Sequence, residues 1–241
     1  MLIVEPRLYQ LNEYSISVRR PLKTSIRILH LSDIHFALPN PSMAAFFDRL
    51  SRIPVDLVFI TGDIIDCPGG IPICIQTVSK LKPKFGTFAV FGNHDYYNYQ
   101  FWDAILHNFP GQAQPRHLQD HLLLQKSLED AGIRVLKNET VTHMVNGEAI
   151  LIHGLDDPTT GRANVRKAMQ NFDPSKVNIL LTHTVDALVD IGENEMNVSF
   201  RRLKELILRV RDQTLLPSCS KGSPGGPLRW GQNSLRPTGG L

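Results

Sequence analysis

The chain lacks several features that mark special classes of protein. It has only three cysteines, an odd number without zinc-type spacing, which argues against a disulfide framework and favours free thiols in a reducing compartment. No apolar run reaches the roughly 18 residues that a membrane-spanning helix needs. The first residues also lack the basic and then apolar pattern of a secretion signal. We therefore expect a cytoplasmic protein whose contact with the inner membrane, if it has any, is peripheral.

Most of the chain also has little net charge. The formal net charge is +3, but residues 201–241 alone contain eight basic and two acidic residues. The residues before them are therefore slightly acidic, and their charge gives no reason to expect a nucleic-acid partner. No protein partner is predicted either.

The length of 241 residues suits one sizeable core better than two. From about residue 212 the composition changes, and residues 217–241 contain four prolines and six glycines with few aliphatic residues. Such a segment cannot bury enough apolar surface to order the chain. The sequence therefore predicts one domain over residues 1–211 and a disordered tail over residues 212–241.

Short strands and helices alternate along the predicted domain. Residues 56–61 form a continuous apolar run, typical of a strand buried on both faces, and Asn146-Gly147 predicts a hairpin turn. Strands are expected at 25–31, 56–61, 87–91, 133–137, 140–145, 148–153 and 178–182, and helices at 43–52, 71–81, 118–131, 162–171 and 199–211. Alternation followed by hairpins predicts a layered α/β sandwich with a mixed sheet.

Polar strings follow several of the predicted strands. These are Asp33-Ile34-His35, Gly62-Asp63-Ile64-Ile65-Asp66 and Gly92-Asn93-His94-Asp95, and His183 follows the run Ile179-Leu180-Leu181. Ligands of α/β sheets bind outside the carboxyl ends of the strands, which is where all these residues fall.

The residue types in these strings suit a pair of metal ions. Asp33 and His35 are two residues apart, so both can turn toward one cation, and the carboxylate of Asp63 can bridge two ions about 3.5–4 Å apart. Asn93 and His183 offer an amide oxygen and an imidazole nitrogen to the second ion. Mixed nitrogen and oxygen ligands fit Mn, Fe, Zn or Co, and a metal-activated water would be the nucleophile.

His94 and Asp95 complete the candidate site as its catalytic residues. His94 directly follows a predicted ligand, so it can point at a leaving oxygen and protonate it, a contribution of about 10²–10⁴-fold. Either Asp95 or the nearby Asp66 can orient the ring of His94.

The strings D-x-H, G-D-x-x-D and G-N-H-D, followed by Leu181-Thr182-His183, resemble the calcineurin-like metallophosphoesterase superfamily over roughly residues 25–185. The stretch Gly154-Leu155-Asp156-Asp157-Pro158 is similar to the small bacterial phosphodiesterases of that superfamily, which include enzymes that cleave UDP-diacylglucosamine in lipid A synthesis. The resemblance implies an α/β/β/α sandwich and a Mn-, Fe- or Zn-dependent hydrolase of phosphoesters, phosphodiesters or pyrophosphates. Its substrate would be a phosphorylated small molecule or a lipid-linked compound.

The resemblance also implies a role for each ligand. Asp33 and His35 would hold the first metal and Asp63 would bridge the two ions. Asn93 and His183 would hold the second metal, and His94 would assist the leaving group.

One part of the family's pattern is missing. The family closes its site with a late Gly-His-x-His string, yet no histidine follows His183 in this sequence, and the last strands of the sandwich also lack counterparts. A shortened or frame-shifted gene product and a natural inactive variant both predict this pattern; we favour the former, because the motifs are intact and the sequence diverges after about residue 200. An enzyme and a catalytically inactive phosphate-binding protein are therefore both retained as hypotheses. Peripheral membrane contact through the basic helix at 199–211 is a third.

Overall fold

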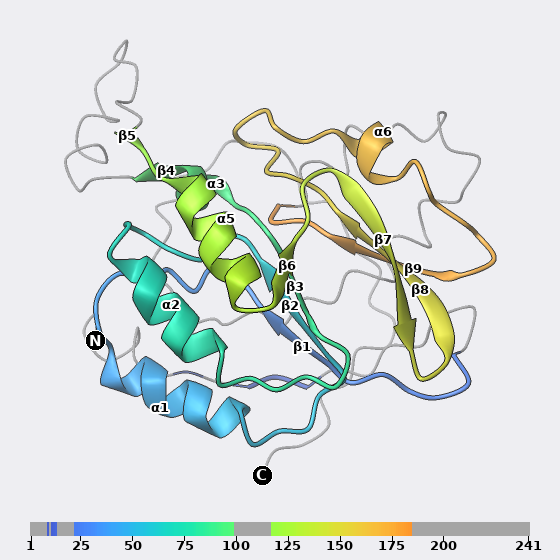
Figure 1. Ribbon diagram of the computed structural model, residues 1–241, viewed down its shortest axis with the longest axis horizontal. Helices are drawn as coiled ribbons and strands as arrows, with labels where there is room; N and C mark the ends of the chain where they lie inside the picture. The colour runs from blue at the N-terminus through green and yellow to red at the C-terminus, as the bar shows by residue number, and fades with distance from the viewer. Residues whose placement is uncertain (1–8, 10, 14–21, 99–116, 185–241) are drawn as a thin grey trace, which may run out of the picture.

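The computed structural model describes residues 9, 11–13, 22–98 and 117–184, and Figure 1 shows how its elements are arranged. The helix expected at 199–211 and the tail expected at 212–241 lie outside the described residues. The expectation that the last strands of the sandwich lack counterparts also concerns residues outside this part of the chain. Within those residues, no helix combines the length and the apolar character needed to cross a membrane.

The elements agree with the expected alternation. The strands are β1 Ile28–Leu31, β2 Leu57–Thr61, β3 Thr87–Val90, β4 Tyr97–Asn98, β5 His117–Leu118, β6 Ile133–Val135, β7 Glu139–Val145, β8 Glu148–Gly154 and β9 Val177–Leu181. The helices are α1 Pro41–Leu50, α2 Gly70–Val78, α3 Asn93–Tyr96, α5 His121–Asp130 and α6 Val165–Ala168.

Two main sheets form the middle of the molecule. The first has the order β1-β2-β3-β6 and is parallel throughout, because helices return the chain between its strands. The second has the order β7-β8-β9, in which β7 and β8 are antiparallel and β9 runs parallel to β8. Asn146 and Gly147 join β7 to β8 with φ angles of 51° and 81°, the left-handed pair that the predicted hairpin turn requires. Only the second sheet is therefore mixed.

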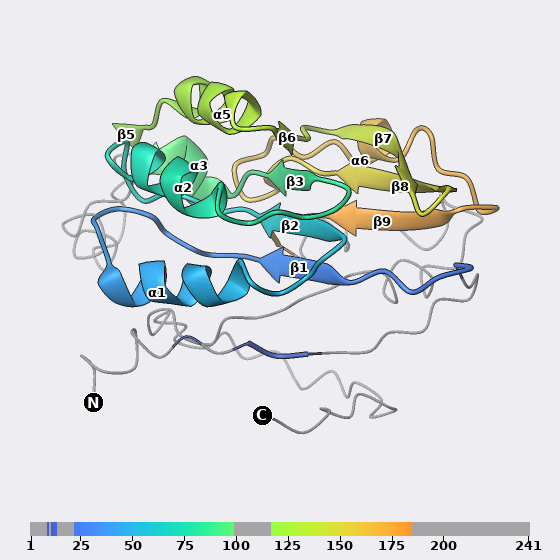
Figure 2. The ribbon, with the colours of Figure 1, turned by 60° about the horizontal axis from the view of Figure 1, so that its bottom comes forward.

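Side chains of β2 alternate between two cores, which explains why the strand is apolar at nearly every position. Val58 and Ile60 pack against helices α1, α2 and α5, whereas Leu57 and Phe59 pack against the second sheet. Each of these fully buried side chains stabilises the fold by about 1.5–3 kcal/mol. Figure 2 shows the helices on one side of the first sheet and the second sheet on the other. Together with α6, which covers a small cluster around Leu180, this arrangement confirms the expected α/β/β/α layers.

Two predicted helices are shorter than expected. The helix predicted at 118–131 begins at His121, because the side chain of Asp120 accepts the N–H of Leu123 at 2.9 Å and so caps the first turn. The helix predicted at 162–171 is the single turn α6, which Asn164 caps through the N–H of Lys167. Local side-chain caps, not the apolar periodicity, therefore set where these two helices begin.

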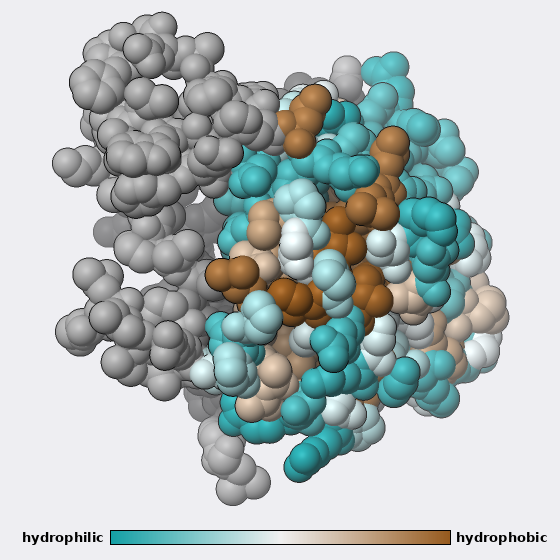
Figure 3. Space-filling model, turned by 60° about the vertical axis from the view of Figure 1, so that its left-hand side comes forward, coloured by the Kyte–Doolittle hydropathy of each residue, from teal (hydrophilic) through white to brown (hydrophobic). Residues whose placement is uncertain are grey.

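The surface is mostly polar, with apolar side chains gathered on one face. Figure 3 shows a brown band across the side of the molecule that lies at the left of Figure 1. Among the described residues, the large apolar side chains with substantial exposure are Leu11, Leu38, Leu118, Leu122, Leu123 and Met144.

Candidate metal centre

The carboxyl ends of four strands lie at one edge of the two sheets. The arrowheads of β1, β2, β3 and β9 in Figure 2 all point the same way. The loops after β1 and β2 are hydrogen-bonded to each other, since the N–H of Asp33 donates to Gly62 O at 3.1 Å and that of His35 donates to Asp63 O at 3.0 Å. These contacts bring together residues some 30 positions apart.

The backbone of these two loops has an unusual conformation. Asp33, His35 and Asp63 have φ angles of 55°, 55° and 52°, in the left-handed region that residues other than glycine seldom adopt. Strained residues of this kind persist only where surrounding contacts hold them, and they cluster at functional sites.

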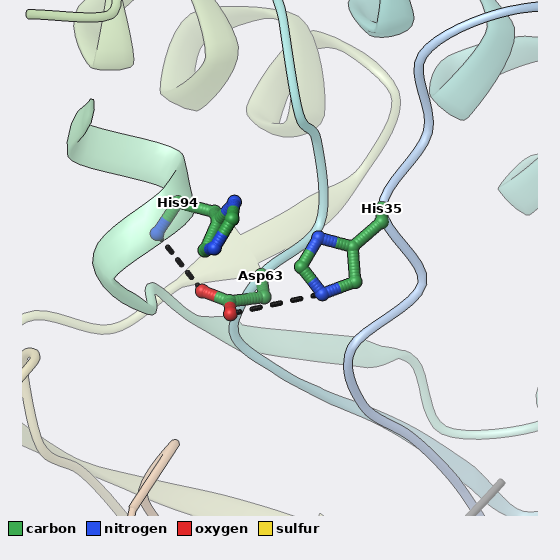
Figure 4. Close-up of side chains that lie close together, drawn as sticks. All are labelled: His35, Asp63 and His94. Carbon is green, nitrogen blue, oxygen red and sulfur yellow. Dashed lines mark hydrogen bonds and ion pairs between the residues drawn. The ribbon is translucent and has the colours of Figure 1, made fainter. Parts of the chain in front are cut away.

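Two groups of candidate ligands share the carboxylate of Asp63. Ligand atoms of His35, Asp63 and His94 all lie within 4.8 Å of one another, and so do ligand atoms of Asp33, Asp63 and His183. Figure 4 shows the first group, with the two imidazole rings on either side of the Asp63 carboxylate. Asp63 itself is 5% exposed, so a buried carboxylate with a group on each side occupies the bridging position. Carboxylate and imidazole donors in this arrangement fit divalent cations.

The grouping differs from the expected division of ligands. Asp33 groups with His183, and His35 groups with His94, whereas Asp33 and His35 were expected on one ion; that assignment stays a prediction. Ser32 Oγ donates to Asp33 Oδ2 at 2.5 Å, and the ring of His35 is held by Asp66.

Asp66 holds two histidines at once. Its Oδ1 lies 2.6 Å from Nδ1 of His35 and 3.1 Å from Nδ1 of His94. Burial by itself would lower the pKa of His35, but the hydrogen bond and charge of Asp66 outweigh it and raise that pKa. The same two histidines hold the pKa of Asp66 far below its usual range despite burial. On the other side of the ring, Nε2 of His35 lies 3.8 Å from Asp63 Oδ2.

His183 faces Asp63 from the second sheet. Its Nδ1 lies 3.0 Å from the carbonyl oxygen of Thr61 and its Nε2 lies 3.3 Å from Asp63 Oδ2. Burial opposes the charged ring, but Asp63 and the Thr61 carbonyl raise the pKa of His183 to about 9. Burial likewise opposes the charge of Asp63, yet its histidine neighbours, His183 foremost, lower its pKa.

Asn93 and His94 open the short helix α3. The N–H of His94 donates to Asp63 Oδ1 at 2.9 Å, and its ring meets that of His35 edge-on, with the centroids 4.7 Å apart. Asn93 is half-buried, and within the described part of the chain its side chain has no hydrogen-bond partner. Its role as a ligand stays a prediction.

Of the two carboxylates considered for orienting His94, Asp66 makes the contact and Asp95 is placed elsewhere. Asp95 is fully buried; its Oδ1 accepts the N–H groups of Ile64 and Ile65 at 2.8 and 3.2 Å, and its Oδ2 accepts that of Gly92 at 2.9 Å. Burial, with the charge of Asp63, raises the pKa of Asp95 to about 7, while these three N–H groups oppose the rise. Asp95 therefore braces the loop that positions Asp63.

Three further residues, to which the sequence assigned no role, shape the site. A Cβ atom on Gly92 would lie 2.3 Å from Asp63 Oδ1, and one on Gly62 would lie 2.5 Å from His183 Nδ1, so both glycines permit close approach. Gln119 donates from its side chain to His94 O at 2.7 Å and from its backbone to Tyr96 O at 2.8 Å. The glycines are visible in the G-D and G-N strings, but nothing in the sequence distinguishes Gln119.

His153, in strand β8, lies in the core. It is fully buried, with Nδ1 2.8 Å from Thr140 Oγ1 and Nε2 3.0 Å from Asn178 Oδ1. Its role is structural.

Comparisons with known proteins agree with this geometry. The chain is 28% identical over 207 residues to the uncharacterized metallophosphoesterase YkoQ of Bacillus subtilis, covering 80% of this chain and 70% of YkoQ. It is 26% identical over 229 residues to the UDP-2,3-diacylglucosamine pyrophosphatase LpxG of Chlamydia muridarum, covering 77% of this chain and 65% of LpxG. A solved structure of a protein of unknown function from Aquifex aeolicus has 15% identity and a TM-score of 0.32, covering 64% of this chain and 76% of that one, a likeness too low to support an argument.

The family assignment comes from the sequence motifs and from a match that extends over most of the chain. Residues 26–209 match the model of the calcineurin-like phosphoesterase family, and these residues include every string at the carboxyl edge of the sheets. The chain therefore belongs to the calcineurin-like phosphoesterase family.

Proposed function

We propose that the protein is a phosphohydrolase that uses two divalent metal ions (Mn, Fe or Zn) to cleave a phosphoester, phosphodiester or pyrophosphate. The observation that supports this most directly is the buried carboxylate of Asp63, which two groups of ligands share. Asp33 and His35 would hold one ion with Asp63. Asn93, through its amide oxygen, and His183 would hold the other ion with the same carboxylate. When bound, such cations activate water and neutralise charge on a phosphoryl group.

His94 is the residue proposed to act on the leaving group. Asp66 contacts Nδ1 of its ring and so orients the imidazole, whose Nε2 would give a proton to the departing oxygen. Asp95 and Gln119 would act as positioning residues, the first through the loop of Asp63 and the second through the carbonyl oxygens of α3.

A lipid-linked substrate is the finer proposal. The relative LpxG is by name a pyrophosphatase of a diacylated sugar nucleotide. In this chain, Leu118, Leu122 and Leu123 expose apolar side chains next to α3, where Gln119 contacts His94. Exposed leucines beside a site are suited to contact acyl chains. Faster cleavage of a lipid-linked pyrophosphate than of its deacylated analogue would support this proposal, and equal rates would contradict it.

A catalytically impaired binding protein is the second candidate function. The absence of any histidine after His183 favours it, because each metal would lack one ligand of the family's pattern. Such a protein would hold a phosphorylated ligand without turning it over.

The decisive experiment is hydrolysis of bis(p-nitrophenyl) phosphate by the purified chain supplied with Mn²⁺. We expect turnover that a chelator abolishes and that Asp63→Asn lowers by more than about 100-fold, beyond the effect of residues that merely support ligands. Asp48→Asn is the matched control, since Asp48 pairs with Lys80 at the surface, 2.7 Å away. A folded, metal-binding protein without turnover would favour the binding function, and full activity of Asp63→Asn would exclude the proposed site.

A further inference from the structure

A cluster of cations surrounds the ring of Tyr96 and takes no part in the site described above. The Arg162 guanidinium carbon lies 4.2 Å from the centroid of this ring, and Lys137 Nζ lies 5.7 Å from it and 4.6 Å from the ring of Phe91. The imidazole of His121 packs against the same ring, with the centroids 4.9 Å apart. Three elements distant in sequence therefore bring basic side chains to one aromatic residue.

These cations lack the partners that charged side chains usually have. Across residues 22–98 and 117–184, neither Lys137 nor Arg162 forms a side-chain hydrogen bond or ion pair. Lys137 is half-buried, and burial lowers its pKa; Asp156 opposes this effect and Arg162 adds to it. A partly desolvated ammonium beside another cation regains favourable interactions when an anion binds.

Two buried carboxylates of the neighbourhood accept hydrogen bonds from other groups, although Oδ1 of Asp157 has no partner among the described residues. Asp156 Oδ1 accepts the hydroxyl of Tyr96 at 2.6 Å and the N–H of Asp157 at 2.8 Å. Asp157 Oδ2 accepts the hydroxyl of Thr159 at 2.7 Å. Both carboxylates are buried, whereas Arg162 is exposed, so the cluster presents positive charge to solvent.

The cluster adjoins the metal centre through α3. Tyr96 follows His94 by two residues in the same helical turn, which separates their Cα atoms by roughly 5 Å. In Figure 1 the segment between β8 and α6, which contains Arg162, runs back toward α3. The ring that both cations contact is therefore carried on the same helical turn as His94.

We propose that Lys137, Arg162 and His121 form a subsite for a second phosphoryl group of the substrate, so that the site is built for a diphosphate. This inference rests on the proposed function for the position of the scissile bond. Arg supplies a planar fork of N–H donors that matches phosphate oxygens, and Lys supplies a compact charge. The hydroxyl contact between Tyr96 and Asp156 keeps the ring, and with it both cations, in place.

Kinetics with two substrates test the subsite. We expect Lys137→Gln and Arg162→Gln each to raise KM about tenfold for ADP-ribose, which has two phosphoryl groups, as loss of one hydrogen bond to a charged group predicts. KM for bis(p-nitrophenyl) phosphate, which has one, should stay within about twofold. Arg162→Lys should restore part of the loss, and Arg166→Gln, an exposed arginine on the adjacent α6, should change neither value. Equal effects on both substrates, or none, would overturn the subsite.

A binding experiment separates this inference from the proposed activity. Methylenediphosphonate, which cannot be hydrolysed at its bridge, is titrated calorimetrically into the Asp63→Asn variant in metal-free buffer. We expect binding that Arg162→Gln weakens about tenfold and Arg166→Gln leaves unchanged, whether or not the wild type turns over any substrate. Absence of binding to Asp63→Asn, or equal binding by both arginine variants, would show that the cluster is no anion subsite.

Discussion

Asp63 and His183 face each other across the two sheets, with Nε2 of the imidazole 3.3 Å from Oδ2 of the carboxylate. The residues are 120 positions apart and follow β2 and β9, strands of different sheets. His183 belongs to the ligand group around Asp33, and Asp63 belongs both to that group and to the group around His35. The arrangement of the two sheets therefore decides whether His183 reaches this carboxylate.

Metal binding should stabilise the protein through Asp63. A ligand at 100 times its dissociation constant adds about 2.7 kcal/mol to the free energy of unfolding, which raises the Tm by several degrees for a domain of this size. We expect Mn²⁺ to produce this rise in the wild type and little or none in Asp63→Asn, as measured by thermal unfolding. An equal rise in both proteins would mean that the cation binds elsewhere.

Replacing Asp66 should weaken catalysis without abolishing it. Asp66→Asn removes the charge that orients the rings of His35 and His94, and such supporting residues typically contribute 10–100-fold in metal affinity or activity. We expect kcat to fall by that amount, together with a weaker affinity for Mn²⁺. Asp56→Asn is the control, since Asp56 accepts the N–H of Arg27 at 2.7 Å at the opposite end of β2. Unchanged kinetics in Asp66→Asn would remove this residue from the site.

A methyl group at Gly92 should disturb the metal centre sterically. Its Cβ would lie 2.3 Å from Asp63 Oδ1 and 2.7 Å from Asp63 N, so the loop must move. We expect Gly92→Ala to lower the free energy of unfolding by about 1–3 kcal/mol, the usual cost of overpacking, as measured by urea denaturation. Gly69→Ala should be neutral or stabilising, because Gly69 has a helical φ of −65° and meets only Cys67 Sγ at 3.9 Å. Equal changes in the free energy of unfolding for Gly92→Ala and Gly69→Ala would contradict the close approach of Gly92 to Asp63.

His153 should make the stability depend on pH. Burial lowers its pKa below the ordinary 6.5, although hydrogen bonds to Asn178 and Ala168 oppose the shift, so the folded state keeps the ring neutral. Below pH 6.5, His153 of the unfolded chain binds a proton, whereas His153 of the folded protein stays neutral. The contribution of His153 to the free energy of unfolding is therefore lost as the pH falls.

His153→Gln isolates this contribution. We expect the difference in unfolding free energy between wild type and variant to be constant from pH 7 to 8. Below about pH 6.5 it should shrink, by at most about 1.4 kcal/mol per pH unit, in chelated buffer. A difference that stays constant down to pH 5 would mean that the ring is protonated in the folded state.

Several features were readable in the sequence because they depend on local patterns. The apolar run of β2, the Asn146-Gly147 turn and the polar strings after each strand predicted the layers and located the candidate ligands. Asp120 and Asn164 show the limit of such patterns, since these caps shortened two predicted helices.

The sequence by itself determined which donor atoms the protein has and at which strand ends they occur, because strand periodicity and loop position are encoded within a few neighbouring residues. Tertiary structure alone decided that His183 meets Asp63, that Asp66 rather than Asp95 contacts the ring of His94, and that Gln119 caps α3. Those outcomes depend on how separate strands and loops pack in space, and a fraction of an ångström there separates a hydrogen bond from none.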